Sequence, residues 1–252
     1  MELRLKLEEL YRRYNRPEYI SPDPLEFVVA QGGTGDCEVV GLIAASLAFG
    51  SVVQINRSVA RVLEVLAEPR RCVLEMRRGE LSRAFHGFRH RYVDGGNLVD
   101  LLSGIRGVLE RYGTLDACFR EGLREDDETV LPALDGFVGR VREGYGGRKN
   151  YLLASPCDGS ACKRMHLYLR WMVRRDSVDP GPWRGVAASK LVVPLDTHMH
   201  RVALRLGLTR RKQANGATAL EITGAFREIV PEDPVKYDFA LTRPGIRKEN
   251  DE

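Results

Sequence analysis

Apolar residues recur at helical spacing along nearly the whole chain, and this periodicity constrains the fold more than any other feature of the sequence. In the first segment, Leu3, Leu7, Leu10 and Tyr14 follow one face of a helix. The alternation typical of a strand is found only in KLVVPL, residues 190–195, where a proline limits strand pairing. We therefore expect an all-α fold.

Polar residues that precede the apolar stripes predict where individual helices begin. Asp36 can cap a buried helix over residues 37–49, and Ser51 can cap the next helix, because their side chains accept hydrogen bonds from free backbone N–H groups. By the same reasoning, further helices are expected to open at Asn97 and Thr129.

The segment FHGFRHRY, residues 85–92, interleaves aromatic and basic side chains, as proteins that bind single strands or flipped bases do. A helix would place its large aromatic residues, including Tyr92, on one side. This spacing favours core positions for the rings and leaves Arg89 and Arg91 as candidates for contact with DNA.

The glycine-rich polar stretch EGYGGRK, residues 143–149, is the clearest candidate for a boundary. It divides the chain into a helical lobe over residues 1–145, whose first helices are free to pack on the other lobe, and a second lobe over residues 146–252. We expect a cleft between the two lobes.

A helix, a tight hairpin and a second helix are predicted directly after this boundary. The first helix covers residues 151–154, the hairpin is SPCDGS at residues 155–160, and the second helix runs over residues 161–175. In the second helix Met165 and its neighbours form an apolar stripe, while Lys163, Arg170 and Arg174 share the opposite side.

Composition excludes several classes of protein. No apolar run approaches the roughly 18 residues that would span a bilayer, and the N-terminus MELRLKLEEL mixes both signs of charge, unlike a signal peptide. The five cysteines include no CxxC pair, which argues against a disulfide framework or a zinc ribbon and fits a reducing compartment. We expect a cytoplasmic monomer with no membrane partner.

Charge is distributed unevenly, although the net charge is only +4. Residues 161–212 carry twelve Lys or Arg against three Asp, a balance of +9, whereas residues 121–135 are strongly acidic. A protein with one basic region suits a polyanion such as nucleic acid. A solvated helix surface would show the same charge pattern.

Lys163 lies in the first turn of its predicted helix, where the positive end of the helix dipole disfavours an ammonium. Neighbouring Arg164 adds positive potential, and both effects favour a neutral amine, the form that attacks a sugar carbon or an aldehyde. Backbone N–H groups of the preceding hairpin could hold a DNA phosphate beside it. A solvent-facing lysine without a function would have the same spacing.

Asp196 opens the helix that follows, where a carboxylate is stabilised in its ionised form. A simple N-cap would look the same. Beside a departing base, a fixed carboxylate can stabilise positive charge on the sugar or take a proton from an attacking amine. Lys163 and Asp196 together are therefore a candidate pair for base removal and strand cleavage.

The segment DTHMH also permits a metal site with Asp196, His198 and His200 as ligands, which would indicate a metal-dependent hydrolase. In a helix, residues two apart point about 200° apart around the axis, so the two histidines cannot converge. The stripe in the following VALRLGL favours a helix. We therefore assign no metal ligands.

These motifs resemble the HhH-GPD (helix-hairpin-helix) superfamily of DNA glycosylases. PLDTHMHRVALRLGL, residues 194–208, is similar to the superfamily's V-D-T-H-x-x-R-V segment, and SPCDGSACK, residues 155–163, looks like the hairpin before the catalytic lysine. The interval of 33 residues between Lys163 and Asp196 is closer to the archaeal 8-oxoguanine glycosylase branch than to endonuclease III. The whole chain, including FRHR and DPVKYDFALTR, also resembles a prokaryotic family defined only as a domain of unknown function.

The superfamily resemblance implies a base-excision glycosylase with abasic-site lyase activity, in which Lys163 is the nucleophile and Asp196 the catalytic carboxylate. Its partner would be double-stranded DNA with a damaged base, such as 8-oxoguanine, or an abasic site. No cofactor is implied, because the four-cysteine loop that holds an iron–sulfur cluster in endonuclease III is missing. Residues expected to contact DNA are Ser155, Gly159, Ser160, Arg164, His198 and Arg201.

Two departures leave alternatives open. The usual hairpin is L-P-G-x-G, and SPCDGS keeps only Gly159, which puts its phosphate or cation site in doubt. Lys190 lies six residues before Asp196 and is a rival nucleophile. A non-catalytic helix-hairpin-helix protein that holds the DNA backbone is the second hypothesis for function.

Overall fold

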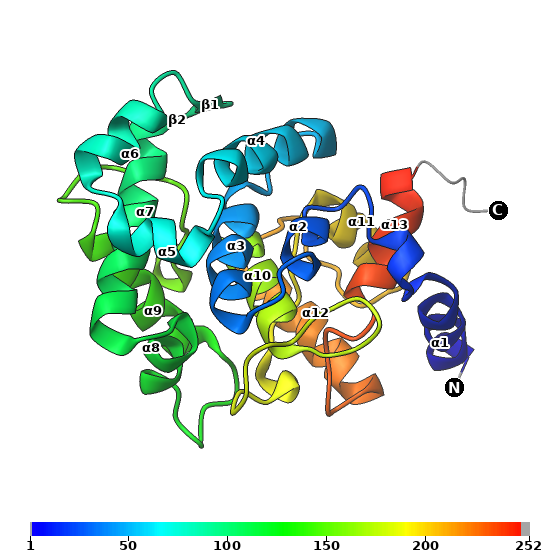
Figure 1. Cartoon of the computed structure of the whole chain (residues 1–252). Coiled ribbons are helices and arrows are strands. Elements are labelled where there is room, and N and C mark those ends of the chain that lie inside the picture. Colours follow the sequence, from blue (N-terminus) through cyan, green and yellow to red (C-terminus); the bar gives the residue numbers. More distant parts are fainter. Residues whose placement is uncertain (1, 248–252) are drawn as a thin grey trace.

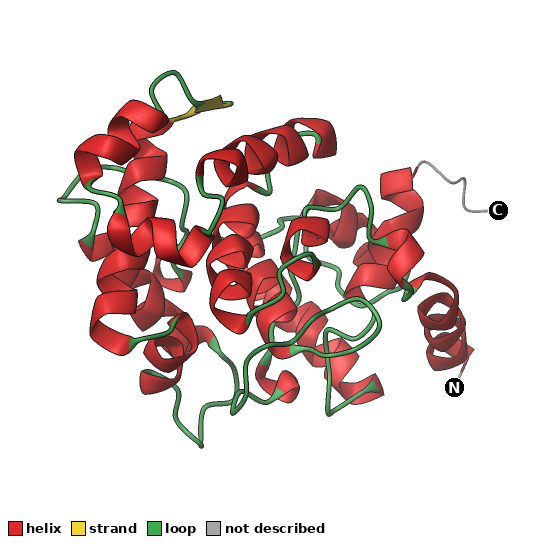
Figure 2. Cartoon of the chain, in the orientation of Figure 1, coloured by secondary structure: helices red, strands yellow, loops and turns green. Residues whose placement is uncertain are grey.

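The structure, a computed structural model that describes residues 2–247, consists of helices joined by short loops (Figures 1 and 2). The predicted all-α fold is confirmed: across the described residues there are thirteen α-helices and one hairpin of two very short strands. The helices are α1 (Glu2–Tyr14), α2 (Leu25–Val29), α3 (Thr34–Leu47), α4 (Val52–Val65), α5 (Pro69–Glu75), α6 (Arg78–Ala84), α7 (Gly95–Tyr112), α8 (Leu115–Glu121), α9 (Leu131–Glu143), α10 (Lys163–Val173), α11 (Thr197–Arg205), α12 (Gly216–Ile229) and α13 (Asp238–Arg247); the strands are β1 (Arg89–His90) and β2 (Val93–Asp94).

Helices α3 and α10 lie at the centre of the molecule and pack directly against each other. Figure 1 shows α5 to α9 on one side of this pair, and α11 to α13 with α1 on the other. The two helices run antiparallel, because Gly41 in α3 faces Met172 near the end of α10 while Lys163 at the start of α10 reaches Ala48 after α3. A Cβ at Gly41 would approach Met172 Cε to 2.8 Å, so a glycine allows this close packing.

The two ends of the described chain pack together. Helix α1 lies against α13 (Figure 1), and Lys236, just before α13, forms a 2.6 Å ion pair with Glu8. Buried apolar residues form one cluster that reaches from Leu7 to Leu241. The expected division at residue 145 stays a prediction.

Local signals predicted some helix starts correctly and others with errors. Ser51 caps α4 by accepting a hydrogen bond from the Gln54 backbone N–H. Asp36 does not cap α3, which begins two residues earlier; its carboxylate accepts a hydrogen bond from the Arg70 N–H at 2.8 Å. The helix predicted to open at Asn97 begins at Gly95 instead and is capped by Asp94.

The interpretation of FHGFRHRY as a helix is wrong. Helix α6 ends at Ala84, and the chain turns at Gly87, which has a left-handed φ of +74°, before it enters the β1–β2 hairpin, where Arg91 has a left-handed φ of +54°. The predicted core positions hold for Phe85 and Phe88, but Tyr92 lies on the surface with 58% of its area exposed. Phe85, Phe88 and Tyr92 have the spacing of one helix face, but the backbone of this segment is not helical.

Two further local predictions differ from the structure. KLVVPL forms no strand: its first residue ends a short 3-10 helix, Ala188–Lys190, and the rest is irregular. Residues 151–154 form no helix, so the hairpin follows a loop, and its centre is a 3-10 turn, Pro156–Asp158. The second helix is present as α10, with Lys163 as its first residue.

No helix in the described part of the chain is both long enough and apolar enough to cross a membrane.

Candidate active site

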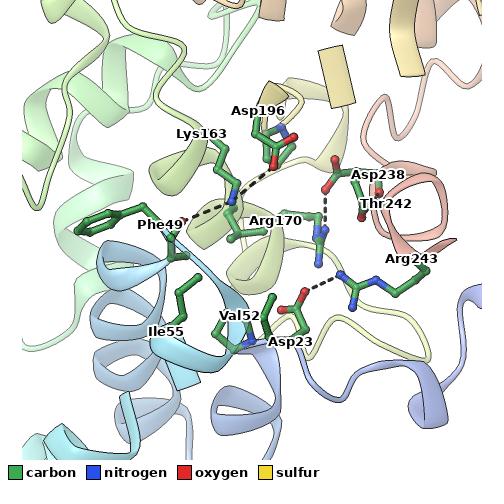
Figure 3. Close-up of a pocket in the computed structure, with 15 residues that line it drawn as sticks. Asp23, Phe49, Val52, Ile55, Lys163, Arg170, Asp196, Asp238, Thr242 and Arg243 are labelled. Atoms are coloured by element: carbon green, nitrogen blue, oxygen red, sulfur yellow. Dashed lines mark hydrogen bonds and ion pairs between the residues drawn. The ribbon is translucent and has the colours of Figure 1, made fainter. Parts of the chain in front are cut away.

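A pocket of about 380 Å³ opens where the C-terminal end of α3 meets the N-terminal ends of α10 and α11 (Figure 3). Its wall combines Phe49 and Ile55, from the first half of the chain, with Lys163, Asp196 and Thr242 from the second half. The volume is in the range of ordinary small-molecule sites, about 300–1,000 Å³. Both residues of the predicted pair therefore face one cavity.

Lys163 Nζ lies 3.8 Å from Asp196 Oδ2, although 33 residues separate them in the chain. The same amine lies 3.5 Å from the Ala48 carbonyl oxygen, at the turn between α3 and α4. The side chains keep 32% and 38% of their area exposed, so a ligand in the pocket can reach both. The amine and the carboxylate are positioned to act on one ligand atom.

The two oxygens of Asp196 have separate contacts. Oδ1 accepts hydrogen bonds from the backbone N–H groups of His198 and Met199, at 2.9 and 2.8 Å, and so caps α11. Oδ2 is the oxygen nearest Lys163. The cap fixes one oxygen of the carboxylate and leaves the other directed to the amine, and the predicted position of Asp196 at the opening of a helix is confirmed.

The floor of the pocket consists of buried ion pairs. Arg170 Nη1 lies 2.5 Å from Asp238 Oδ2, and Arg243 Nη2 lies 2.6 Å from Asp23 Oδ2 (Figure 3). Burial raises the pKa of Asp238 above its ordinary value, although Arg170 opposes this shift. For Asp23, burial acts in the same direction, but Arg243, the Leu25 backbone N–H and Arg170 together outweigh it, and the pKa lies below its ordinary value.

The network continues behind the pocket through Arg174. Its guanidinium contacts Asp179, lies 2.8 Å from Asp233 and 2.9 Å from Asp176, and only 3% of the side chain is exposed. The predicted placement of Arg170 and Arg174 on a polar helix side, away from the core, is wrong: both are buried because carboxylates from later segments surround them. The charge of this region is thus partly neutralised inside the protein.

The hairpin residues lie in different surroundings. Ser155 is buried and hydrogen bonded through its hydroxyl to Asp135, whereas Gly159 and Ser160 are exposed. The backbone N–H groups of Asp158 and Gly159 donate to the carbonyls of Ser155 and Pro156 within the turn. These N–H groups are therefore used inside the hairpin.

The other three predicted DNA contacts are not among the residues that line the pocket. Arg164, next to Lys163, donates to the Ser46 and Tyr151 carbonyls at 2.8 and 2.6 Å. His198 is partly buried beside Asp196, and Arg201 is exposed one helical turn further along α11. Their contact with DNA stays a prediction.

Lys190 lies away from the pocket, because its amine donates to the carbonyls of Arg124 and Glu125 at 2.9 and 2.7 Å. His200 is buried and its Nε2 lies 2.8 Å from the Arg211 carbonyl, so the two histidines of DTHMH do not converge on Asp196. Among residues 2–247, no three His, Cys, Asp or Glu side chains lie close enough to hold a metal ion.

Sequence reasoning missed the pocket residues Asp23, Asp238 and Arg243. DPVKYDFALTR, residues 233–243, contains two of them, and in the sequence this segment indicates only the family resemblance. Charged residues at positions 238 and 243, on either side of the apolar run FAL at residues 239–241, are the signal that could have indicated buried pairing.

Searches of curated proteins and of solved structures each gave no match to the chain. A family profile described as "Protein of unknown function (DUF2400)" matches residues 23–247. The matched range covers most of the chain and includes every residue named above as lining the pocket. The chain therefore belongs to the DUF2400 family.

Proposed function

We propose that the protein is a DNA base-excision glycosylase with an associated lyase step. One observation carries the proposal: an amine and a carboxylate, 3.8 Å apart, face a pocket of about 380 Å³ that can hold a nucleobase or a sugar. The resemblance of residues 155–163 and 194–208 to the HhH-GPD glycosylases supports the same roles for Lys163 and Asp196.

The proposed reaction begins with a nucleotide flipped out of the duplex. After Lys163 loses a proton, its Nζ attacks C1′; a C–N bond forms while the bond from C1′ to the base breaks, and the base leaves with the electron pair and takes up a proton. Asp196 stabilises positive charge on the sugar and is near enough to receive the proton of the ammonium. Ring opening gives an imine, and loss of a C2′ proton then breaks the C3′–O bond.

Part of the pocket wall carries oxygen atoms that can accept hydrogen bonds, on Thr242 and on Asp238, whose carboxylate is also paired with Arg170 in the floor. A base that carries several N–H donors on one edge, such as an oxidised purine, would suit this wall. We propose 8-oxoguanine as the first lesion to test for this reason, together with the resemblance to the archaeal branch.

Incubation of the protein with duplexes that carry single defined lesions, with borohydride present, tests the function. Hydride reduction of the imine would leave a covalent protein–DNA adduct, and we expect it with an abasic site and with at least one damaged base. A protein that binds these duplexes without any adduct or base release would support the second hypothesis, non-catalytic DNA binding, and contradict the proposal.

Substitutions at Asp196 distinguish its role as the cap of α11 from its role as a charge beside Lys163. Asp196→Asn keeps an acceptor oxygen for the N–H groups of His198 and Met199, so we expect a nearly unchanged melting temperature. It removes the charge beside Lys163, and base release should fall roughly a hundredfold or more. Asp196→Ala should lower activity similarly and also cost about 1 kcal/mol through loss of the cap. Equal activity of Asp196→Asn and the unmodified protein would exclude the catalytic role.

A further inference from the structure

A second cavity, of about 680 Å³, lies beside the lysine pocket and has a different lining. It is formed by rings, basic side chains and part of the SPCDGS hairpin, including Tyr92, Tyr151, Lys149, Arg164 and Ser160. Tyr92 and Tyr151 are 58% and 54% exposed, high values for large aromatic residues. We call this cavity the aromatic groove.

Phe49 separates the aromatic groove from the lysine pocket. It lines the pocket, and its ring stacks on Tyr92 with centroids 5.1 Å apart and an interplanar angle of 26°. The ring of Tyr151 meets Tyr92 edge to face, with centroids 6.4 Å apart. Figure 3 shows the Phe49 ring directed away from Asp196. A continuous series of rings thus leads out from the pocket that holds Lys163.

The β1–β2 hairpin is anchored so that Tyr92 stays in place. His90 Nε2 lies 3.0 Å from the Phe49 carbonyl oxygen, and His90 Nδ1 lies 2.9 Å from the Ser58 hydroxyl on α4. Arg91 lies over Gly50, where an added Cβ would meet its Cδ at 3.1 Å. Exposed rings that are held by buried contacts are prepared for a ligand at little cost in conformational entropy.

The groove carries positive charge. Arg164 lies over the Phe49 ring at 5.0 Å, and within the described chain its hydrogen bonds go to carbonyl oxygens. Lys149 lies over the Tyr151 ring at 5.2 Å. Arg148 and Arg78 share a single carboxylate, Asp100. Burial lowers the pKa of Arg164, so a nearby anion would stabilise its charged form.

We infer that the aromatic groove binds a second, unpaired nucleobase, stacked on one of the two perpendicular rings, Tyr92 or Tyr151, and in edge contact with the other, with its phosphate beside Lys149 and Arg164. Exposed rings interleaved with cations match the two parts of a nucleotide, a flat base and an anionic backbone. The base could be the neighbour of the flipped nucleotide on the same strand or its former partner on the opposite strand. The inference rests on the proposed function, because it requires that a nucleotide occupies the lysine pocket.

Binding measurements on the full chain test this inference. The probes are duplexes with a stable abasic analogue, either with all other bases present, with the neighbouring base also removed, or with the opposite base removed. Since stacking of one base on an aromatic side chain changes affinity by at least about fivefold, removing the stacked base should weaken binding of the unmodified protein by that factor at fixed salt. The probe whose affinity falls identifies the strand that carries the stacked base.

Variants at the two tyrosines, combined with the base removals in the DNA, complete a double-mutant cycle. Tyr92→Ala with Tyr151→Ala should weaken binding to the complete duplex by at least about fivefold and abolish the effect of removing the stacked base. Tyr92→Phe with Tyr151→Phe retains both rings and should bind like the unmodified protein. The inference is overturned if the double alanine variant loses the same factor of affinity for all three probes. It is also overturned if the unmodified protein binds equally well when either base is removed.

Borohydride trapping on a simple abasic site distinguishes failure of the proposed lyase chemistry from failure of the aromatic-groove assignment. If the unmodified protein traps but the binding cycle shows no coupling, the groove assignment alone fails. If trapping never occurs while coupling is present, the groove binds a base and the proposed chemistry is wrong.

Discussion

Lys163→Ala should abolish the borohydride-trapped adduct with abasic DNA. The imine can form only at a primary amine, and Lys163 supplies the amine that the structure places in the pocket, 3.8 Å from Asp196. Base release from a damaged duplex should fall by about three orders of magnitude or more, because the nucleophile itself is lost. Gel electrophoresis of trapped complexes and of cleaved strands measures both effects.

Lys190→Ala is the matched control. Its amine donates to two carbonyls near residues 124–125 and lies outside the pocket, so trapping should persist at the level of the unmodified protein. Retention of the adduct in Lys163→Ala together with its loss in Lys190→Ala would assign the nucleophile to Lys190. Because the Lys163 side chain is partly exposed, we expect Lys163→Ala to fold, and a circular dichroism spectrum that matches the unmodified protein checks this.

The positions of Lys163 and Asp196 at the starts of two helices could be predicted from local signals. An Asp before THMHRVAL is a recognisable N-cap, and the helix after SPCDGS begins at the lysine. Their meeting across 33 residues came from the superfamily resemblance, since no local rule determines how two helix ends are oriented to each other.

The buried charges could not be predicted in the same way. Arg170 and Arg174 occupy one side of an amphipathic helix, which in isolation indicates a solvated face. Their partners come from positions 179, 233 and 238, and only tertiary packing brings these carboxylates to α10. Spacing was equally misleading for Tyr92, whose interval from Phe88 fits a helix while the backbone forms a hairpin.

Arg174→Met should destabilise the protein strongly. The guanidinium is 3% exposed and pairs with Asp176, Asp179 and Asp233, so its removal leaves carboxylates without their partner in the interior. Breaking a buried ion pair by removing one partner costs about 3–5 kcal/mol, a large share of the roughly 5–15 kcal/mol that stabilises a typical protein. Urea denaturation at neutral pH measures the loss. Arg175→Met, at the exposed neighbouring position, should change the free energy of unfolding by less than about 0.5 kcal/mol.

The deficit of Arg174→Met relative to the unmodified protein should shrink as the pH falls. Burial already raises the pKa of Asp179 although Arg170 and Arg174 oppose it, and loss of one guanidinium raises it further. A carboxyl group whose pKa is higher in the folded than in the unfolded chain binds a proton preferentially in the folded state, so stability returns as the pH is lowered through the folded pKa towards the unfolded value, about 3.9. Arg174→Lys keeps a positive charge and should show a smaller deficit with less pH dependence. A deficit that stays constant from about pH 7 to about pH 5 would mean that lost packing, rather than unpaired charge, destabilises the variant.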